Sequence, residues 1–170
     1  MRKRNLIFIG MPAAGKSTIG VVVAKRLGMR FLDTDLLIQE QEGMLLREII
    51  RKVGEEGFQQ IENQVNRDVQ TENSVISPGG SVVYCEEAMQ HFKENGTVVY
   101  LQISYETIRR RIKDPKKRGV LLRPGQSLKD LYEERIPLFE KYADLTVCED
   151  GLPIEQTIEA VLEVVEKSKL

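Results

Sequence analysis

The stretch Gly10-Met11-Pro12-Ala13-Ala14-Gly15-Lys16-Ser17-Thr18 decides the fold. It has the spacing G-x-x-x-x-G-K-[ST], which is informative only where it joins a strand to a helix. Residues 6–9 before it are a continuous apolar run, typical of a strand buried in a parallel sheet. Residues 19–27 after it carry apolar side chains at helical spacing, and Gly28 is a plausible helix stop. We therefore predict a phosphate-binding loop.

Each residue type in this loop suits a nucleotide phosphate. The backbone N–H groups and the N-terminus of the following helix offer partial positive charge, and Lys16 adds a full charge. The hydroxyl of Ser17 is placed to bind Mg²⁺. The alternative is a glycine-rich turn with a stray Lys-Ser pair, which the flanking strand and helix disfavour. The expected nucleotide contacts are Gly10, Ala13, Ala14, Gly15, Lys16, Ser17 and Thr18.

Composition limits the class of partner. The 170 residues fit a single domain, 1–170, with a sizeable core. Lys and Arg total 25 against 26 acidic residues, so we expect no nucleic acid and no membrane surface as a partner. The distant Cys85 and Cys148 suit reduced thiols in the cytoplasm, and we assign them no function. These features favour a small-molecule partner.

Two carboxylates end the second predicted strand, residues 31–35. Period-two alternation would place Asp33 and Asp35 on the same side, at the carboxyl edge where ligands bind in open α/β sheets. The alternative is that Asp35 caps a helix over residues 36–42, because Asp is favoured at that position. Both roles can coexist.

Strands and helices alternate along the remaining chain. We expect helices at 45–52 and 55–71, broken at Gly54, then a strand at 74–77 that ends in a Gly79-Gly80 turn. Further helices are expected at 86–93, 105–112, 127–142 and 153–169, and further strands at 97–101 and 144–148. Pro137 predicts a kink or break near Ile136, and His91 is expected to be a surface or half-buried helix residue. The alternation predicts a parallel sheet with helices on both faces, joined by right-handed crossovers.

Residues 113–119 are basic and rich in helix breakers, so they are expected to form a mobile loop. A solvated charge run is the usual interpretation. In a chain with a phosphate-binding loop, the same segment is also a candidate lid over a transferred phosphoryl group, extending over about 113–124.

Taken together, these residues resemble the shikimate kinase family of P-loop kinases almost from end to end. The resemblance is carried by residues 10–18, Asp33-Thr34-Asp35, Gly54-Glu55 with Phe58 and Glu62, and Arg135-x-Pro137-Leu138-Phe139. It implies a P-loop NTPase-type three-layer α/β sandwich with a five-stranded parallel sheet of order 2-3-1-4-5. It also implies acceptor-binding helices at about 35–62, a lid, and ATP-dependent phosphoryl transfer with Mg²⁺.

On the nucleotide side, the resemblance implies that Lys16 contacts the β- and γ-phosphates. Ser17 would bind Mg²⁺, and Asp33 would hold the shell of the ion through water. Arg111 would stack on adenine, with Pro153 on the other face of the ring.

On the acceptor side, the resemblance implies that Asp35 binds the acceptor hydroxyl and takes its proton. Arg118 matches the lid arginine, and Arg135 matches a carboxylate-binding arginine. Gly79 and Gly80 match glycines that bind the substrate.

Three departures from the family pattern fall on the acceptor side and the lid. Gln59 replaces one of two arginines that hold the shikimate carboxylate, and Ser81 replaces the third glycine of a triplet. The lid signature Arg-Pro-Leu-Leu has become Arg118-Gly119-Val120-Leu121. Gln59 can donate one neutral hydrogen bond but not a bidentate charged pair, so carboxylate affinity is expected to fall unless another residue compensates.

Shikimate is the first candidate acceptor, and a related polyol or hydroxy acid is the main alternative. A nucleoside or nucleotide kinase is less favoured, because the basic residues are spaced as in the sugar-acid family. A regulatory module that binds nucleotide without catalysis is a further alternative, but it would not need the carboxylate of Asp35. We expect a monomer in the cytoplasm.

Overall fold

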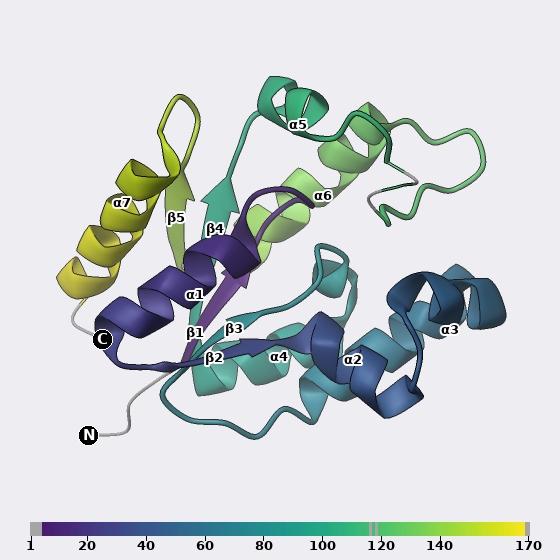
Figure 1. The fold of residues 1–170 in the computed structure, drawn as a ribbon, viewed down its shortest axis with the longest axis horizontal. Coiled ribbons are helices and arrows are strands. Elements are labelled where there is room, and N and C mark those ends of the chain that lie inside the picture. Colours follow the sequence, from purple (N-terminus) through teal and green to yellow (C-terminus); the bar gives the residue numbers. More distant parts are fainter. Residues whose placement is uncertain (1–4, 116, 118, 169–170) are drawn as a thin grey trace.

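The computed structural model describes residues 5–115, 117 and 119–168 of the chain. Its strands are β1 (Asn5–Ile9), β2 (Arg30–Asp33), β3 (Ser74–Ser77), β4 (Gly96–Gln102) and β5 (Leu145–Cys148). Its helices are α1 (Lys16–Leu27), α2 (Thr34–Glu42), α3 (Leu46–Arg67), α4 (Glu86–Asn95), α5 (Tyr105–Arg111), α6 (Leu128–Tyr142) and α7 (Ile154–Lys167), with a short 3-10 helix η1 (Val82–Tyr84). Figure 1 shows how they are arranged.

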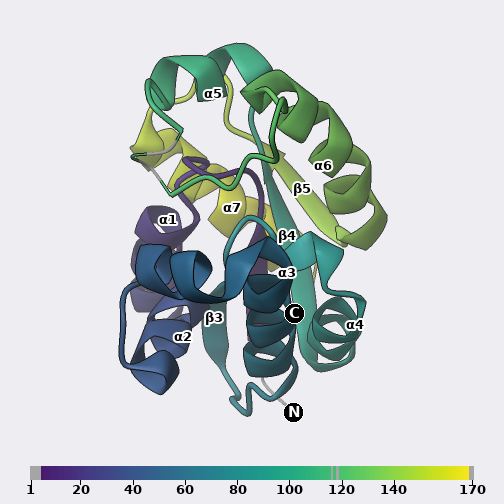
Figure 2. The same ribbon diagram turned by 90° about the vertical axis from the view of Figure 1, so that its right-hand side faces the viewer.

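The five strands form one parallel sheet of order β2-β3-β1-β4-β5, which confirms the predicted fold class. The central strand β1 is buried along its whole length because both faces of the sheet are covered. Figure 2 shows α4 and α6 on one side of the sheet and α1 on the other, where α1 also packs against α7. All strands run in one direction, so their carboxyl ends meet at a single edge. Among the described residues, no helix combines the length and apolar character needed to cross a bilayer.

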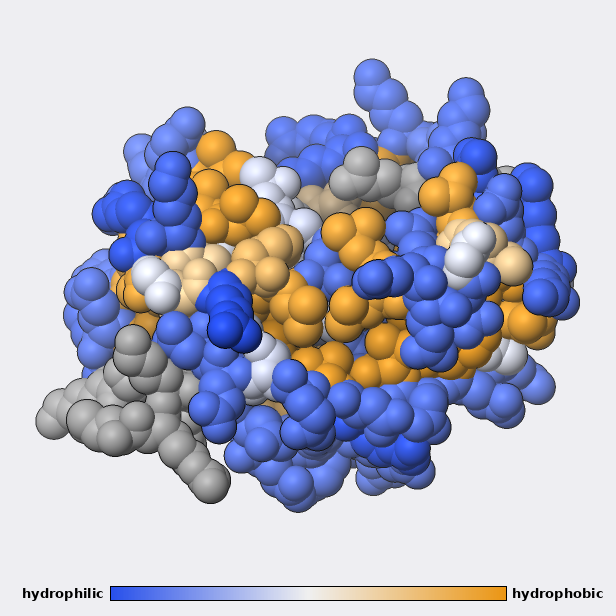
Figure 3. All heavy atoms as spheres, turned by 60° about the horizontal axis from the view of Figure 1, so that its bottom comes forward, coloured by the Kyte–Doolittle hydropathy of each residue, from blue (hydrophilic) through white to orange (hydrophobic). Residues whose placement is uncertain are grey.

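The apolar interior has two parts. The main core surrounds the sheet, while a smaller cluster of Ile38, Ile49, Phe58 and Val65 lies between α2 and α3. Figure 3 shows a band of hydrophobic residues bordered by hydrophilic ones, so this face is not uniformly polar. Apolar side chains that remain exposed on α2 and at the start and middle of α3 include Leu36, Leu45 and Val53. The small cluster between α2 and α3 gives this α2–α3 unit a core of its own.

The boundary between β2 and α2 differs from the prediction. The strand ends at Asp33 rather than at residue 35, and α2 begins at Thr34. Asp33 is the cap, because its Oδ1 accepts hydrogen bonds from the backbone N–H groups of Asp35 (3.0 Å) and Leu36 (3.4 Å). Asp35 consequently lies in the first turn of α2 and does not cap it.

Two helix breakers behave differently. Gly54 has φ 75° and ψ −179°, so the predicted break within α3 is confirmed, although the second part ends at Arg67 rather than 71. In contrast, α6 is one helix across Pro137, so of the predicted kink or break near Ile136 the break is absent. Buried side chains on both sides of Pro137, including Arg135 and Phe139, hold α6 in place and can offset one lost hydrogen bond.

His91 is half-buried, as predicted, and its Nε2 lies 2.8 Å from the carbonyl oxygen of Val69.

Asn5 joins three segments at the amino end of the sheet. Its buried Nδ2 donates to the carbonyl oxygens of Thr71 (2.9 Å) and Asn95 (3.2 Å). Its Oδ1 accepts a hydrogen bond from the backbone N–H of Ser74 (3.0 Å). The side chain therefore satisfies backbone groups that would otherwise be buried without partners.

Replacing this side chain should destabilise the fold. Asn5→Ala leaves up to three backbone groups unsatisfied, each at a cost of about 1–3 kcal/mol when fully buried. Because the bonds to Thr71 and Asn95 are only partly buried, we expect the free energy of unfolding to fall by about 2–4 kcal/mol. Urea denaturation followed by circular dichroism measures the change. Gln41→Ala, which removes an exposed amide on α2, is the control and should change stability by less than about 0.5 kcal/mol. A loss no larger than that in Asn5→Ala would contradict this account of the amino edge.

Candidate active site

The loop after β1 and the start of α1 form one wall of a cavity of about 510 Å³. Gly15 caps α1 with φ 79°, a left-handed conformation that glycine adopts readily. Ala13 also has a positive φ, 66°, which is strained for a residue with a Cβ. A helix N-terminus that faces a cavity in this way is an anion-binding arrangement.

Lys16 is the cation of this wall. Its buried Nζ donates hydrogen bonds to the carbonyl oxygens of Gly10 (2.9 Å) and Met11 (3.0 Å). Burial lowers the pKa of Lys16 to about 8, and the nearby Asp35 carboxylate opposes that shift. An anion in the cavity would favour the charged amine further.

Three side chains with oxygen atoms lie together beside the loop: Ser17 at the start of α1, Asp33 at the end of β2 and Ser77 at the end of β3. The hydroxyl of Ser17 donates to Asp33 Oδ2 at 2.9 Å and lies 3.2 Å from the Ser77 hydroxyl. Mg²⁺ prefers oxygen ligands, and in nucleotide sites one or two protein groups complete a shell of water and phosphate. Ser17 and Asp33 therefore fit a magnesium ion.

Asp35 and Glu62 approach the same glycine on the opposite wall. A Cβ placed on Gly79 would lie 2.9 Å from Asp35 Oδ1 and 2.8 Å from Glu62 Oε1, so a larger residue would displace both carboxyl groups. Burial, assisted by the charge of Asp33, raises the pKa of Asp35 to about 6. Asp35 is therefore poised to exchange a proton near neutral pH.

Glu62 is fully buried and only partly satisfied. Its Oε2 accepts a hydrogen bond from the Ser81 hydroxyl (2.7 Å), and Oε1 has no partner among the described residues. Burial raises the pKa of Glu62 to about 7, while the hydrogen bond from Ser81 acts in the other direction.

Arg135 brings a buried guanidinium to the cavity from α6. The side chain forms no ion pair with any carboxylate in the described part of the chain, and its Nε has no hydrogen-bond partner there. Its Cζ lies 5.3 Å from the ring centroid of Tyr84, and a Cβ on Gly80 would lie 3.2 Å from Arg135 Nη1. A buried cation without a counter-charge is costly, so this group indicates a binding site for an anion.

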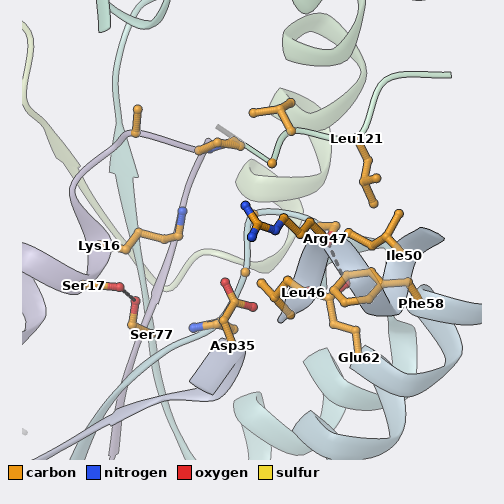
Figure 4. Close-up of a pocket in the computed structure, with 18 of the residues that line it drawn as sticks. Lys16, Ser17, Asp35, Leu46, Arg47, Ile50, Phe58, Glu62, Ser77 and Leu121 are labelled. Carbon is orange, nitrogen blue, oxygen red and sulfur yellow. Dashed lines mark hydrogen bonds between the residues drawn. The ribbon is translucent and has the colours of Figure 1, made fainter. Parts of the chain in front are cut away.

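Figure 4 shows the cavity lined from several elements, with Lys16 and Asp35 both pointing into it. Apolar side chains of Leu46, Ile50, Phe58 and Leu121 form one part of the lining. Lys117, Gly119 and Val120 from the predicted lid also line the cavity, and Val120 is buried.

A second hollow lies beside the loop, lined by α5 and the turn before α7. Arg111 donates from Nη1 to the Ala13 carbonyl (2.9 Å) and to Glu149 Oε2 (3.2 Å). Burial raises the pKa of Glu149 to about 7. Pro153 follows Leu152, a lining residue of this hollow, and caps α7. The structure thus connects Arg111 directly to the phosphate-binding loop.

The structure brings most of the predicted site residues into one cavity. The predicted residues in its lining are Ala13, Gly15, Lys16, Ser17, Thr18, Asp35, Gly79, Gly80, Ser81 and Arg135. Gly10 and Ala14 are buried beneath the loop, and Asp33 reaches the site through Ser17. Gln59 lies elsewhere, in a separate hollow with Tyr84 and Cys85. Arg118 lies outside the described residues.

Several polar residues of the site, among them Glu62, Ser77 and Arg47, were not assigned a role from the sequence. Glu62 appeared only as part of a motif, while Ser77 and Arg47 were not singled out. The end of a strand next to a Gly-Gly turn is a usable signal for Ser77, since ligands bind at carboxyl ends of parallel strands. The position of Arg47 depends on tertiary packing and has no comparable local signal.

Comparison with known proteins agrees with this geometry. A family model described as shikimate kinase matches residues 12–166. A shikimate kinase from Aquifex aeolicus is 36% identical over 159 residues, which cover 93% of this chain and 94% of that protein. One from Persephonella marina is 34% identical over 160 residues, covering 94% and 97%. The solved structure of shikimate kinase from Acinetobacter baumannii in complex with shikimate has a TM-score of 0.89 and 30% identity, covering 99% of this chain and 96% of that one. The chain therefore belongs to the shikimate kinase family and is an ATP-dependent kinase that transfers phosphate to a hydroxyl.

Proposed function

We propose that this protein transfers the γ-phosphoryl group of ATP to a hydroxyl of shikimate, a ring that carries hydroxyls and one carboxylate. The observation that carries this proposal is the buried, unpaired guanidinium of Arg135 in the same cavity as Lys16 and Asp35. A carboxylated acceptor would neutralise Arg135, whereas a neutral polyol would leave it without a counter-charge.

The lining of the cavity suits such a ring. Leu46, Ile50 and Phe58 offer an apolar surface for ring carbons, while Asp35 and Glu62 offer acceptors for hydroxyl groups. An acceptor with one apolar face and several hydroxyls can therefore satisfy both kinds of lining at once.

Positioning and charge stabilisation supply most of the catalysis in phosphoryl transfer. In our proposal, the loop N–H groups and Lys16 hold the β- and γ-phosphates, and Lys16 neutralises charge that develops during transfer. Asp35 binds the attacking hydroxyl. Arg135 and the backbone at Gly79 and Gly80 fix the rest of the acceptor.

The acceptor oxygen forms a bond to the γ-phosphorus, the bond from that phosphorus to the β,γ-bridging oxygen breaks, and ADP leaves with that electron pair. The hydroxyl proton passes to the carboxylate of Asp35, whose raised pKa makes it a competent base at neutral pH.

Ser17 and Asp33 would hold Mg²⁺, which supplies neutralising charge to the phosphates when bound. Arg118 would add a further positive charge from the lid, and Arg111 with Pro153 would hold the adenine. The free thiols of Cys85 and Cys148 support action in the reducing cytoplasm. A monomeric state stays a prediction.

The acceptor assignment is tested by activity on a panel of acceptors. We expect ADP release with shikimate and ATP, and at least tenfold lower kcat/KM with simple polyols, because a neutral polyol leaves Arg135 without a counter-charge. Quinate and gluconate, which also carry a carboxylate, complete the panel. Higher kcat/KM for a neutral polyol than for shikimate would overturn the proposed substrate while leaving the kinase class intact.

Loss of the loop lysine should abolish turnover without unfolding the protein. Lys16→Ala removes a charge that stabilises the transferred group, so we expect kcat to fall by about a hundredfold or more. Lys25→Ala, an exposed lysine on α1, is the matched control and should keep wild-type kcat. If Lys16→Ala kept more than about a tenth of wild-type kcat, the proposed role of Lys16 would be wrong.

Asp35→Asn should lower kcat far more than it weakens ATP binding, because its partner is the acceptor hydroxyl. In the wild type, kcat/KM should fall about tenfold per pH unit below about pH 6, where Asp35 becomes protonated. The variant should lack this acid limb. Equal losses of ATP affinity and turnover would instead place Asp35 in nucleotide binding.

The same variant should be more stable at high pH. The pKa of Asp35 rises from 3.8 to about 6 in the folded state, so the folded protein binds this proton more tightly than the unfolded chain. The free energy of unfolding therefore falls as the pH rises through this interval, and the loss persists above it. Asp35→Asn should raise Tm at pH 8, with the gain vanishing near pH 4. An unchanged or lower Tm at pH 8 would contradict burial as the cause of the shift.

A further inference from the structure

Arg47 is a cation of the cavity that the proposed function has not used. It lies in the first turn of α3 and lines the same cavity as Lys16, Asp35 and Arg135. Figure 4 shows its side chain reaching from α3 into the cavity, with the guanidinium on the side of Lys16 and Asp35. The residue is exposed, and its guanidinium has no hydrogen bond or ion pair to the part of the chain that the structure describes.

Local helix energetics do not account for an arginine at this position. A positive charge in the first turn opposes the helix dipole. The residue four positions later is Arg51, a like charge on the same helix face, which is also unfavourable. Arg47 therefore lowers the stability of the isolated helix, and a ligand of opposite charge would offset that loss.

The excess of positive charge in the cavity also favours an anionic ligand for Arg47. Its described lining contains the cations Lys16, Arg47, Lys117 and Arg135 but only two carboxylates, Asp35 and Glu62. In our proposal, Lys16 serves the phosphates of ATP, and Arg135 alone serves the acceptor carboxylate. Gln59 lines another hollow and brings no charge to this one.

We infer that Arg47 binds the carboxylate of the acceptor together with Arg135, and so sets the preference for a carboxylated substrate. This inference rests on the proposed function. Arg47 and Arg135 come from α3 and α6, two elements that contribute separately to the lining. The carboxylate is thus held from two elements.

The test compares shikimate with its methyl ester, which keeps the ring and hydroxyls but lacks the negative charge. We expect Arg47→Gln to raise KM for shikimate tenfold or more, while KM for the ester and for ATP change less than twofold and kcat less than threefold. Arg47→Lys should fall between wild type and Arg47→Gln, since it keeps the charge but not the bidentate geometry. Arg51→Gln, one turn later on the same helix, is the matched control and should match the wild type.

Other outcomes overturn the inference in distinguishable ways. An equal rise in KM for shikimate and for the ester would show that Arg47 does not read the carboxylate. A fall in kcat with unchanged KM for shikimate would place Arg47 on the transferred phosphoryl group. Wild-type kinetics in Arg47→Gln would remove it from the site altogether. Absence of wild-type activity with shikimate would instead overturn the proposed function, and the inference with it.

Discussion

The constraint on which this site depends is the enclosure of unpaired charges of both signs in one cavity. Lys16, Asp35, Glu62 and Arg135 all line it, and among the described residues none of them forms an ion pair with another. Burial lowers the pKa of the lysine and raises the pKa of both carboxyl groups, so each of these three groups is less readily charged than it would be in water. The fold tolerates this cost because α1, α2, α3 and α6 bring the four groups to one cavity, where ligand charges can complete the pairing.

The two hydrophobic cores hold different parts of the cavity lining in place. The main core fixes β1 and α1, and therefore the loop that carries Lys16. The small cluster around Ile38 and Phe58 fixes the α2–α3 unit, which carries Phe58 and Glu62 of the cavity lining. Leu121, from the predicted lid, packs against this cluster. A unit with its own small core can shift against the sheet without unfolding the nucleotide side. Leu121, from the predicted lid, and the α2–α3 unit therefore share one hydrophobic cluster.

Much of the fold and the nucleotide site could be predicted because the signals are local. The spacing of residues 10–18 specifies a loop whose conformation depends on its own glycines and on the adjacent strand and helix. The end of β2 could not be placed as well, because the carboxylate of Asp33 satisfies backbone donors and starts α2 two residues early. Whether Gln59 and Arg47 face the cavity could be predicted even less well from the sequence. The break at Gly54 changes the direction of α3, so which residues face the cavity depends on packing and not on helical spacing alone.

Ser81 shows how the altered acceptor side can remain functional. The family pattern has glycine at this position, whereas here the Ser81 hydroxyl donates to Glu62 at 2.7 Å. Burial raises the pKa of Glu62 to about 7, and this hydrogen bond acts in the other direction by stabilising the carboxylate. Among the described residues, the guanidinium of Arg135 forms no ion pair with Glu62 and stays available to a ligand. Because Glu62, Ser81 and Arg135 line the same cavity, loss of the Ser81 hydroxyl would raise the pKa of Glu62 and so alter the charge that the acceptor encounters.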